Sequence, residues 1–134
     1  MNIIVCVDKS HGMMFNNRRQ SQDKELVSKI VELTSNSRLL MSEYSAEMFG
    51  ENATIVVDNH FITQAQAGDF VFIEETEIPT EQVEDIYIFN WNRDYPADKY
   101  FDFDLKANGY KRMKTIDFAG NSHKKITLEI FKRA

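Results

Sequence analysis

The chain has 134 residues, a formal net charge of −5, and hydrophobic residues at 43% of its positions. This length suits one domain with a buried core, so we expect a single domain over residues 1–134. No apolar run approaches the roughly 18–20 residues that a membrane-spanning helix needs, and the amino-terminal segment lacks the basic start of a signal peptide. The sequence therefore predicts a cytoplasmic protein without a membrane partner.

The charge is unevenly distributed along the chain. Residues 69–104 carry eleven acidic and two basic side chains, whereas residues 105–134 carry two acidic and eight basic ones. The acidic stretch argues against general nucleic-acid binding, which needs a broad basic face. We expect the basic stretch to be a solvated hairpin whose charges complement the acidic segment.

Apolar runs of strand length alternate with helical patterns over the first two thirds of the chain. We expect strands at residues 3–8, 38–41, 54–57, 70–73 and 86–89. The first run is apolar almost throughout, which is typical of a central strand buried on both faces of a parallel sheet. Two helices connect the early strands. One extends to Leu33 from an N-cap at Ser21 or Asp23, and the other covers residues 43–49.

The carboxyl-terminal part has the pattern of an antiparallel hairpin. Residues 110–118 and 125–133 alternate in polarity, and the turn-forming sequence at residues 119–122 separates them. The whole order of elements predicts an α/β fold. Its mixed sheet has a parallel core, an antiparallel C-terminal hairpin and helices on its faces.

The chain contains one cysteine and three histidines. Cys6 lies in the middle of the first strand, where we expect a small core residue that forms no intramolecular disulfide. His11, His60 and His123 are far apart and lack the spacing of a metal site. We therefore expect surface or turn positions for the histidines, and no bound metal.

Three stretches resemble a known family in their sequence and in their order. Residues 3–7, followed by Gly12 and Met13, are similar to a first strand and the start of a mobile loop. Residues 39–50 are similar to a strand-to-helix segment V-I-M-G-R-x-T-x-E-S-I-G without a gap, and residues 126–133 to a last strand. Together they resemble dihydrofolate reductase. The resemblance covers most of the chain and implies that family's three-layer sandwich.

The residues that carry the family's chemistry do not match. Leu26 stands where the carboxylate that binds the pteridine is expected, and Glu25 is one position away. The arginine that binds the cofactor phosphate falls on Glu43, which would repel a phosphate, although Ser45 fits the helix-cap threonine. An acidic link at residues 74–84 replaces the loop whose backbone N–H groups bind the pyrophosphate. The resemblance therefore implies a domain that has lost reductase chemistry and holds no cofactor.

The sequence also looks like short clostridial-type bacterial proteins that carry the label ribonuclease Z. That enzyme needs a His-x-His-x-Asp-His zinc motif and a much longer chain. This sequence contains no such motif, so the label does not imply a zinc-dependent nuclease.

Polar and charged side chains are concentrated in the segment that leads into the first helix. Adjacent arginines can hold a phosphate or carboxylate through paired hydrogen bonds, and helix N-termini attract anions. In open α/β sheets, such segments lie at the carboxyl ends of the strands, where ligands bind. The second helix begins across the same cleft. We expect an anion or nucleotide site formed by Asn16, Arg18, Arg19, Gln20, Ser21, Asp23, Tyr44 and Ser45.

Three functions are compatible with the sequence, and it leaves open whether the chain is an enzyme. The first is a domain without reductase activity that binds an anionic small molecule or a partner through residues 16–23. The second is an enzyme of unknown type that acts on a nucleotide or RNA end. Its active-site residues would be Arg18, Arg19, Asp8 and Glu25, with Asp8 and Glu25 as a general acid–base pair. In the simpler alternative, Asp8 only caps a strand end. The third is a homodimer that pairs through the C-terminal hairpin.

Overall fold

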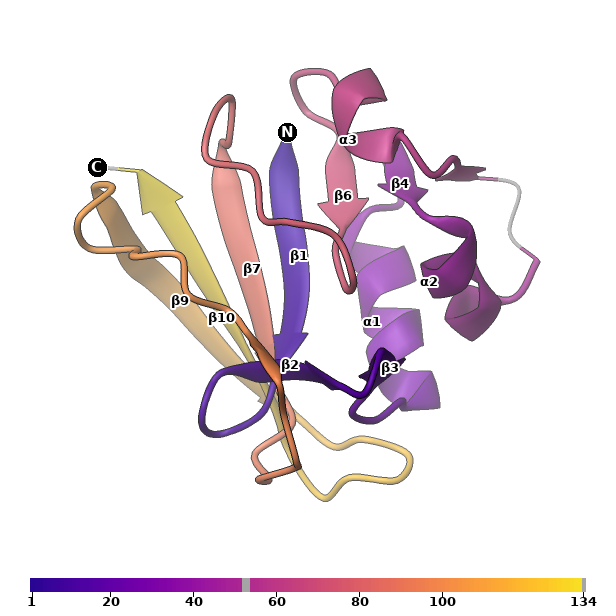
Figure 1. The fold of residues 1–134 in the computed structure, drawn as a ribbon, viewed down its shortest axis with the longest axis vertical. Helices are drawn as coiled ribbons and strands as arrows, with labels where there is room; N and C mark the ends of the chain where they lie inside the picture. Colours follow the sequence, from indigo (N-terminus) through magenta and orange to yellow (C-terminus); the bar gives the residue numbers. More distant parts are fainter. Residues whose placement is uncertain (52–53, 134) are drawn as a thin grey trace.

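The structure is a computed structural model that describes residues 1–51 and 54–133. Within these residues, seven strands form one sheet in the order β5-β4-β6-β1-β7-β10-β9. Their bounds are β1 Asn2–Val7, β4 Leu39–Met41, β5 Ile55–Val57, β6 Phe70–Phe72, β7 Asp85–Asn90, β9 Tyr110–Phe118 and β10 Ile126–Arg133. Figure 1 shows this order across the molecule, with β9 and β10 on one side of β1 and with β6 and β4 on the other.

The centre of the sheet is parallel and one edge is antiparallel, as predicted. β1 pairs in parallel with β6, placing Ile3 opposite Val71, and with β7, placing Val5 opposite Ile88. β10 runs antiparallel to both β7 and β9. Ile3, Ile4 and Val5 have no exposed surface, as expected for a strand that is covered on both faces. The predicted mixed sheet with a C-terminal hairpin is therefore confirmed.

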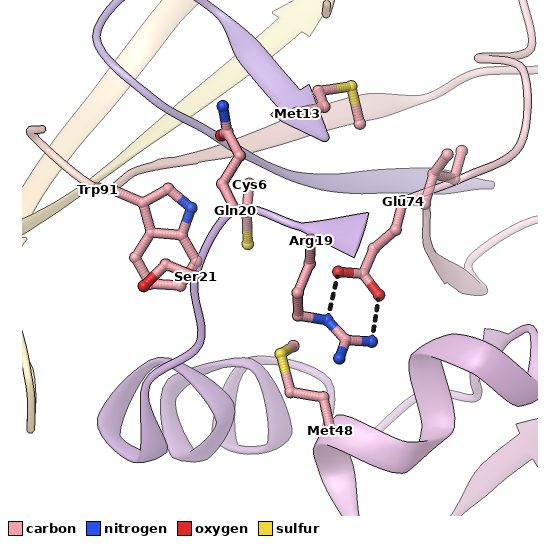
Figure 2. Close-up of a pocket in the computed structure, with 9 residues that line it drawn as sticks. Cys6, Met13, Arg19, Gln20, Ser21, Met48, Glu74 and Trp91 are labelled. Carbon is pink, nitrogen blue, oxygen red and sulfur yellow. Dashed lines mark hydrogen bonds and ion pairs between the residues drawn. The ribbon is translucent and has the colours of Figure 1, made fainter. Parts of the chain in front are cut away.

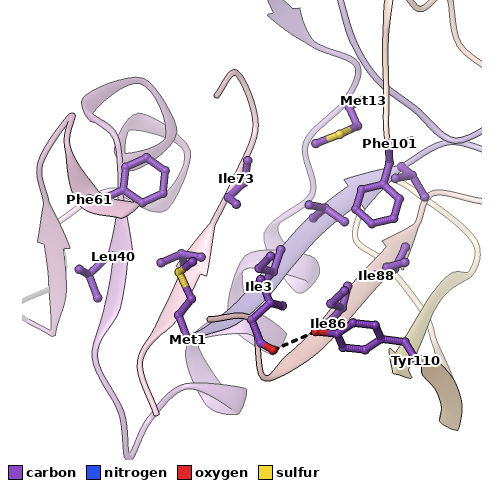
Figure 3. Close-up of a cluster of buried hydrophobic side chains, with 14 of the residues drawn as sticks. Met1, Ile3, Met13, Leu40, Phe61, Ile73, Ile86, Ile88, Phe101 and Tyr110 are labelled. Atoms are coloured by element: carbon purple, nitrogen blue, oxygen red, sulfur yellow. Dashed lines mark hydrogen bonds between the residues drawn. The ribbon is translucent and has the colours of Figure 1, made fainter. Parts of the chain in front are cut away.

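Helices and connecting segments cover the two faces of the sheet. The helices are α1 Lys24–Leu33, α2 Glu43–Phe49 and α3 Phe61–Gln64. Leu26 and Ile30 of α1 pack in one core cluster with Ile4, and Phe61 of α3 belongs to the other cluster, with Ile3 (Figure 3). The sheet is thus the middle of three layers. No helix in the described part of the chain is long and apolar enough to cross a membrane.

The segment before α1 differs from the predicted loop, because most of it forms a small second sheet. Gly12–Phe15 (β2) pairs with Arg18–Arg19 (β3) on one side and with Lys99–Tyr100 (β8) on the other. Asn16 and Asn17 connect β2 to β3 with φ angles of 54° and 62°. Positive φ at both turn residues is the geometry of a type I′ hairpin turn, which favours Asn. These asparagines therefore shape a turn, a role that we had not predicted.

Segments that are distant in the sequence meet at one end of the main sheet. β1 and β6 finish there, and the β2–β3–β8 sheet, the start of α1 and the β9–β10 loop lie at the same end (Figure 1). The start of β1 and the end of β10 lie at the opposite end. The predicted site residues are therefore positioned where ligands bind in open α/β sheets.

Candidate functional site

A buried ion pair joins β3 to the end of β6. Nε and Nη2 of Arg19 donate to the two carboxylate oxygens of Glu74, each at 3.0 Å. The two side chains are 17% and 8% exposed, and the paired hydrogen bonds fix the plane of the guanidinium. Burial alone would lower the pKa of Arg19, but the hydrogen bonds and charge of Glu74 raise it. Arg19 is therefore a fixed, fully charged group.

The first turn of α2 completes this cluster. The Tyr44 hydroxyl accepts a hydrogen bond from the Arg19 backbone N–H at 2.8 Å, and the Tyr44 carbonyl accepts one from Nη2 at 3.1 Å. The guanidinium also lies 4.4 Å from the centroid of the Tyr44 ring, a cation–π contact. Ser45 Oγ donates to Glu74 at 2.9 Å. The structure thus brings together three predicted residues, Arg19, Tyr44 and Ser45, around a carboxylate that we had not predicted.

A small cavity lies beside the ion pair. Its volume is about 10 Å³, which is room for about one water molecule. It is lined by Cys6, Met13, Arg19, Gln20, Ser21, Met48, Ile73, Glu74 and Trp91 (Figure 2). Cys6, predicted as a core residue, is half-buried at this cavity. Burial and the nearby charge of Glu74 raise the pKa of the Cys6 thiol, so it stays protonated at neutral pH.

A second polar cluster joins the start of α1 to the β9–β10 loop. His123 Nδ1 lies 2.9 Å from Oδ2 of Asp23. Its Nε2 lies 3.0 Å from Ser21 Oγ and 3.1 Å from the Tyr95 hydroxyl. The imidazole is only 4% exposed and stacks on Trp91, with 4.6 Å between the ring centroids. His123 lies in a turn, as predicted, but its ring is buried among polar groups and is not a surface side chain.

The Asp23 carboxylate connects the two segments of this cluster. It accepts hydrogen bonds at 2.8 and 3.3 Å from the first turn of α1, which identifies Asp23 as the N-cap. It also accepts from the backbone N–H groups of Asn121 and Ser122, at 2.9 and 2.8 Å. Burial would raise the pKa of Asp23, but these hydrogen bonds and the one from His123 hold it well below the ordinary value of 3.8. The carboxylate is therefore ionised at neutral pH.

Asp8 holds loops in place and is not paired with Glu25. Its carboxylate is 1% exposed and accepts from the backbone N–H groups of Ser10, Gly12 and Tyr95, at 2.8 to 3.1 Å. Although burial opposes it, this set of hydrogen bonds lowers the pKa of Asp8. Glu25 is exposed on α1, and no contact within the described residues joins it to Asp8. The structure does not assemble the expected acid–base pair.

The other predicted residues lie around these clusters. Gln20 donates from Nε2 to Asp8 at 3.0 Å. Asn16 and Arg18 are exposed at the tip of the β2–β3 hairpin. The Arg18 side chain forms no hydrogen bond or ion pair with any residue in 1–51 or 54–133, so its guanidinium is available to a ligand. The predicted residues are therefore neighbours in space but form separate groups, one around Glu74 and one around His123.

The residues that sequence reasoning missed are Glu74, Trp91, Tyr95 and His123. Glu74 had a usable signal, since it immediately follows a predicted parallel strand and must lie at the ligand-binding edge of the sheet. His123 gave only a weak signal, a histidine immediately after the predicted turn at residues 119–122. No group of three or more His, Cys, Asp or Glu side chains among the described residues is arranged to hold a metal ion.

A larger groove of about 540 Å³ runs past the second cluster, between α1, α2 and the β9–β10 loop. Its lining residues are Gln22, Asp23, Lys24, Val27, Ser28, Met48, Phe49, Asn121 and Ser122. This volume is within the range of small-molecule sites. Met48 lines both the groove and the small cavity, so its side chain forms part of the wall between them.

No protein-family model matches the sequence, and no match is found among curated proteins. The structure is similar to that of dihydrofolate reductase from Enterococcus faecalis, solved in complex with NADP(H) and RAB-propyl, with a TM-score of 0.67. The similarity covers 98% of this chain and 95% of the other, at 9% sequence identity. The chain has a dihydrofolate reductase-like fold. At this identity the likeness concerns the fold alone.

Proposed function

We propose that this dihydrofolate reductase-like domain has no reductase activity. The Arg19–Glu74 ion pair is the observation that carries the proposal. In the family that the sequence resembles, the pyrophosphate is bound by backbone N–H groups of the loop after the strand that corresponds to β6. Here Glu74 follows β6, and its paired hydrogen bonds with Arg19 fill that side of the cleft with side chains. The similar enzyme was solved with NADP(H), whereas the cavity beside Glu74 is only about 10 Å³.

The pteridine side of the cleft supports the same proposal. Leu26 occupies the position where the resemblance places the substrate carboxylate, and it is fully buried in the core below α1. Glu25, the neighbouring acid, is exposed. A proton donor for a pteridine ring is therefore missing from the place where that chemistry needs it.

We also propose that the domain binds a small carboxylate or phosphate at Arg19. Glu74 and Tyr44 hold Nε and Nη2, while Nη1 donates to no residue that the structure describes. Figure 2 shows Arg19 reaching between Glu74 and Met48. A fixed guanidinium with a free edge suits an anionic oxygen, and the exposed Arg18 adds positive charge nearby. Buried ion pairs contribute little net stability, which favours a functional role for this pair.

A thermal-shift screen with carboxylates, sugar phosphates and nucleotides tests the proposal. A ligand at 100 times its dissociation constant stabilises a protein by about 2.7 kcal/mol, which raises the melting temperature by several degrees. We expect such a shift for wild type and no shift for the double variant Arg19→Gln/Glu74→Gln, which removes both charges of the pair. Arg112→Gln is the matched control, because Arg112 is an exposed arginine that pairs with Glu129 on the C-terminal hairpin. Equal shifts in all three proteins would place the anion elsewhere.

A further inference from the structure

Ser21, His123 and Asp23 have the relative geometry of a nucleophile, its base and the group that orients the base. Ser21 Oγ lies 3.0 Å from Nε2 of His123, and Nδ1 of the same ring lies 2.9 Å from Asp23 Oδ2. Both lie within the range for an activated nucleophile and its hydrogen-bonded base. Ser21 and Asp23 are two positions apart on one segment, and His123 reaches them from a loop about 100 positions further on. This arrangement is independent of the proposed anion site at Arg19.

The charge state of Asp23 determines which nitrogen of His123 carries the proton. An ionised carboxylate can only accept hydrogen bonds, so Nδ1 carries the proton that Asp23 accepts. When Nδ1 holds the only ring proton, Nε2 is an acceptor, and it faces the hydroxyls of Ser21 and Tyr95. Stacking on Trp91 keeps the ring in this orientation. His123 is thus held as a base that can take the proton of Ser21.

Two further features suit acyl transfer. Ser21 is half-buried and lines the small cavity, which shares the Met48 side chain with the 540 Å³ groove. Methionine is unbranched and adaptable, so a rotation of Met48 would connect Ser21 with the groove. In addition, the backbone N–H groups of Ser21 and Gln22 form no hydrogen bond with any described residue. Such free donors beside a nucleophile can stabilise an oxyanion.

We propose that Ser21, His123 and Asp23 form a catalytic triad that hydrolyses small carboxylic esters, with the acyl chain in the groove beside Met48. Val27 and Phe49 supply apolar groove surface for a short acyl chain, and Gln22 and Lys24 supply polar surface at its rim. Figure 2 shows Ser21 next to Trp91, with Met48 extending from α2 toward the same cavity.

The reaction balances with water as the only co-substrate. Ser21 Oγ attacks the ester carbonyl while its proton passes to Nε2 of His123. The ester C–O bond breaks, and the imidazolium returns that proton to the leaving alkoxide, which departs as an alcohol. Water then attacks the acyl-serine while its proton moves to Nε2. The bond between the acyl carbon and Ser21 Oγ breaks, the serine oxygen regains a proton, and a carboxylic acid is released.

Hydrolysis of p-nitrophenyl acetate by the purified full chain is the first test. We expect Ser21→Ala to reduce the protein-dependent rate by at least about 100-fold, because it removes the nucleophile that the base serves. This variant removes only one hydroxyl, so it should stay folded, which circular dichroism can verify. Ser35→Ala is the matched control, because Ser35 is exposed beyond the far end of α1. We expect it to keep the wild-type rate.

Covalent labelling is the second test and is independent of turnover. Wild-type protein treated with diisopropyl fluorophosphate should gain one diisopropylphosphoryl group, which peptide mass spectrometry should assign to Ser21. Ser35→Ala should be labelled equally, and Ser21→Ala should not be labelled. A wild-type rate in Ser21→Ala, or failure of the reagent to modify Ser21, would show that the triad geometry only ties α1 to the β9–β10 loop.

Discussion

Glu74→Ala is expected to destabilise the protein by about 3–5 kcal/mol, because it leaves the Arg19 guanidinium buried without its counter-charge. The same change removes the acceptor of the Ser45 hydroxyl, which is also buried. Urea denaturation at pH 7 measures the loss as a lower midpoint with an unchanged slope.

Two comparisons isolate the buried charge in this experiment. The double variant Arg19→Met/Glu74→Leu should recover most of that loss, because replacing both partners leaves no unpaired charge and only the Ser45 hydroxyl still lacks its acceptor. Glu129→Ala breaks the exposed pair with Arg112 and should cost less than about 1 kcal/mol. A loss for Glu74→Ala as small as that for Glu129→Ala would mean that the ion pair is solvated in solution and the cleft is open.

Asp23→Asn is expected to lower the free energy of unfolding by about 2 kcal/mol or more at pH 7. It should also reduce the loss of stability that the protein shows as the pH falls. The fold holds the pKa of Asp23 below the ordinary value of 3.8, so folding favours the charged form. That contribution is fully present above pH 4 and is lost progressively as the pH falls toward the folded-state pKa. Asparagine can still cap α1, but it cannot provide the charge that binds His123 and the β9–β10 loop.

Unfolding midpoints at pH 7, 5 and 3 give the required comparison. The difference in unfolding midpoint between wild type and Asp23→Asn should be constant from pH 7 to 5 and should become smaller at pH 3. Asp117→Asn is the control, because Asp117 is an exposed residue of β9 whose carboxylate accepts a hydrogen bond from Thr127 Oγ1. It should change stability by less than about 0.5 kcal/mol. A gap that is unchanged at pH 3 would show that the carboxylate charge does not stabilise the fold.

Local sequence signals predicted most of the regular structure. Ser42 was a good N-cap candidate, and its side chain accepts from the Ser45 N–H at 3.2 Å. Gly50 ends α2 with a φ of 69°, a conformation that glycine adopts readily. The β2–β3 hairpin was missed because its strands are very short and its two-residue turn is Asn-Asn, without the glycine that marks most such turns.

The candidate site could be predicted only in part, because its decisive contacts span long distances in the sequence. Periodicity and capping rules act over a few residues, and they correctly located Arg19 and Ser45 at the same edge of the sheet. Glu74 lies 55 positions from Arg19, and His123 lies 100 positions from Asp23. No spacing rule connects such residues, so their pairing emerges only from the order in which the strands assemble.

The most direct test of the central claim, that this fold no longer supports reductase chemistry, is a calorimetric titration with NADPH followed by an assay of dihydrofolate reduction. We expect no saturable NADPH binding at micromolar concentrations and no NADPH oxidation above the rate without protein, because Glu74 and Arg19 fill the cofactor side of the cleft. Tight NADPH binding together with dihydrofolate turnover would contradict the claim.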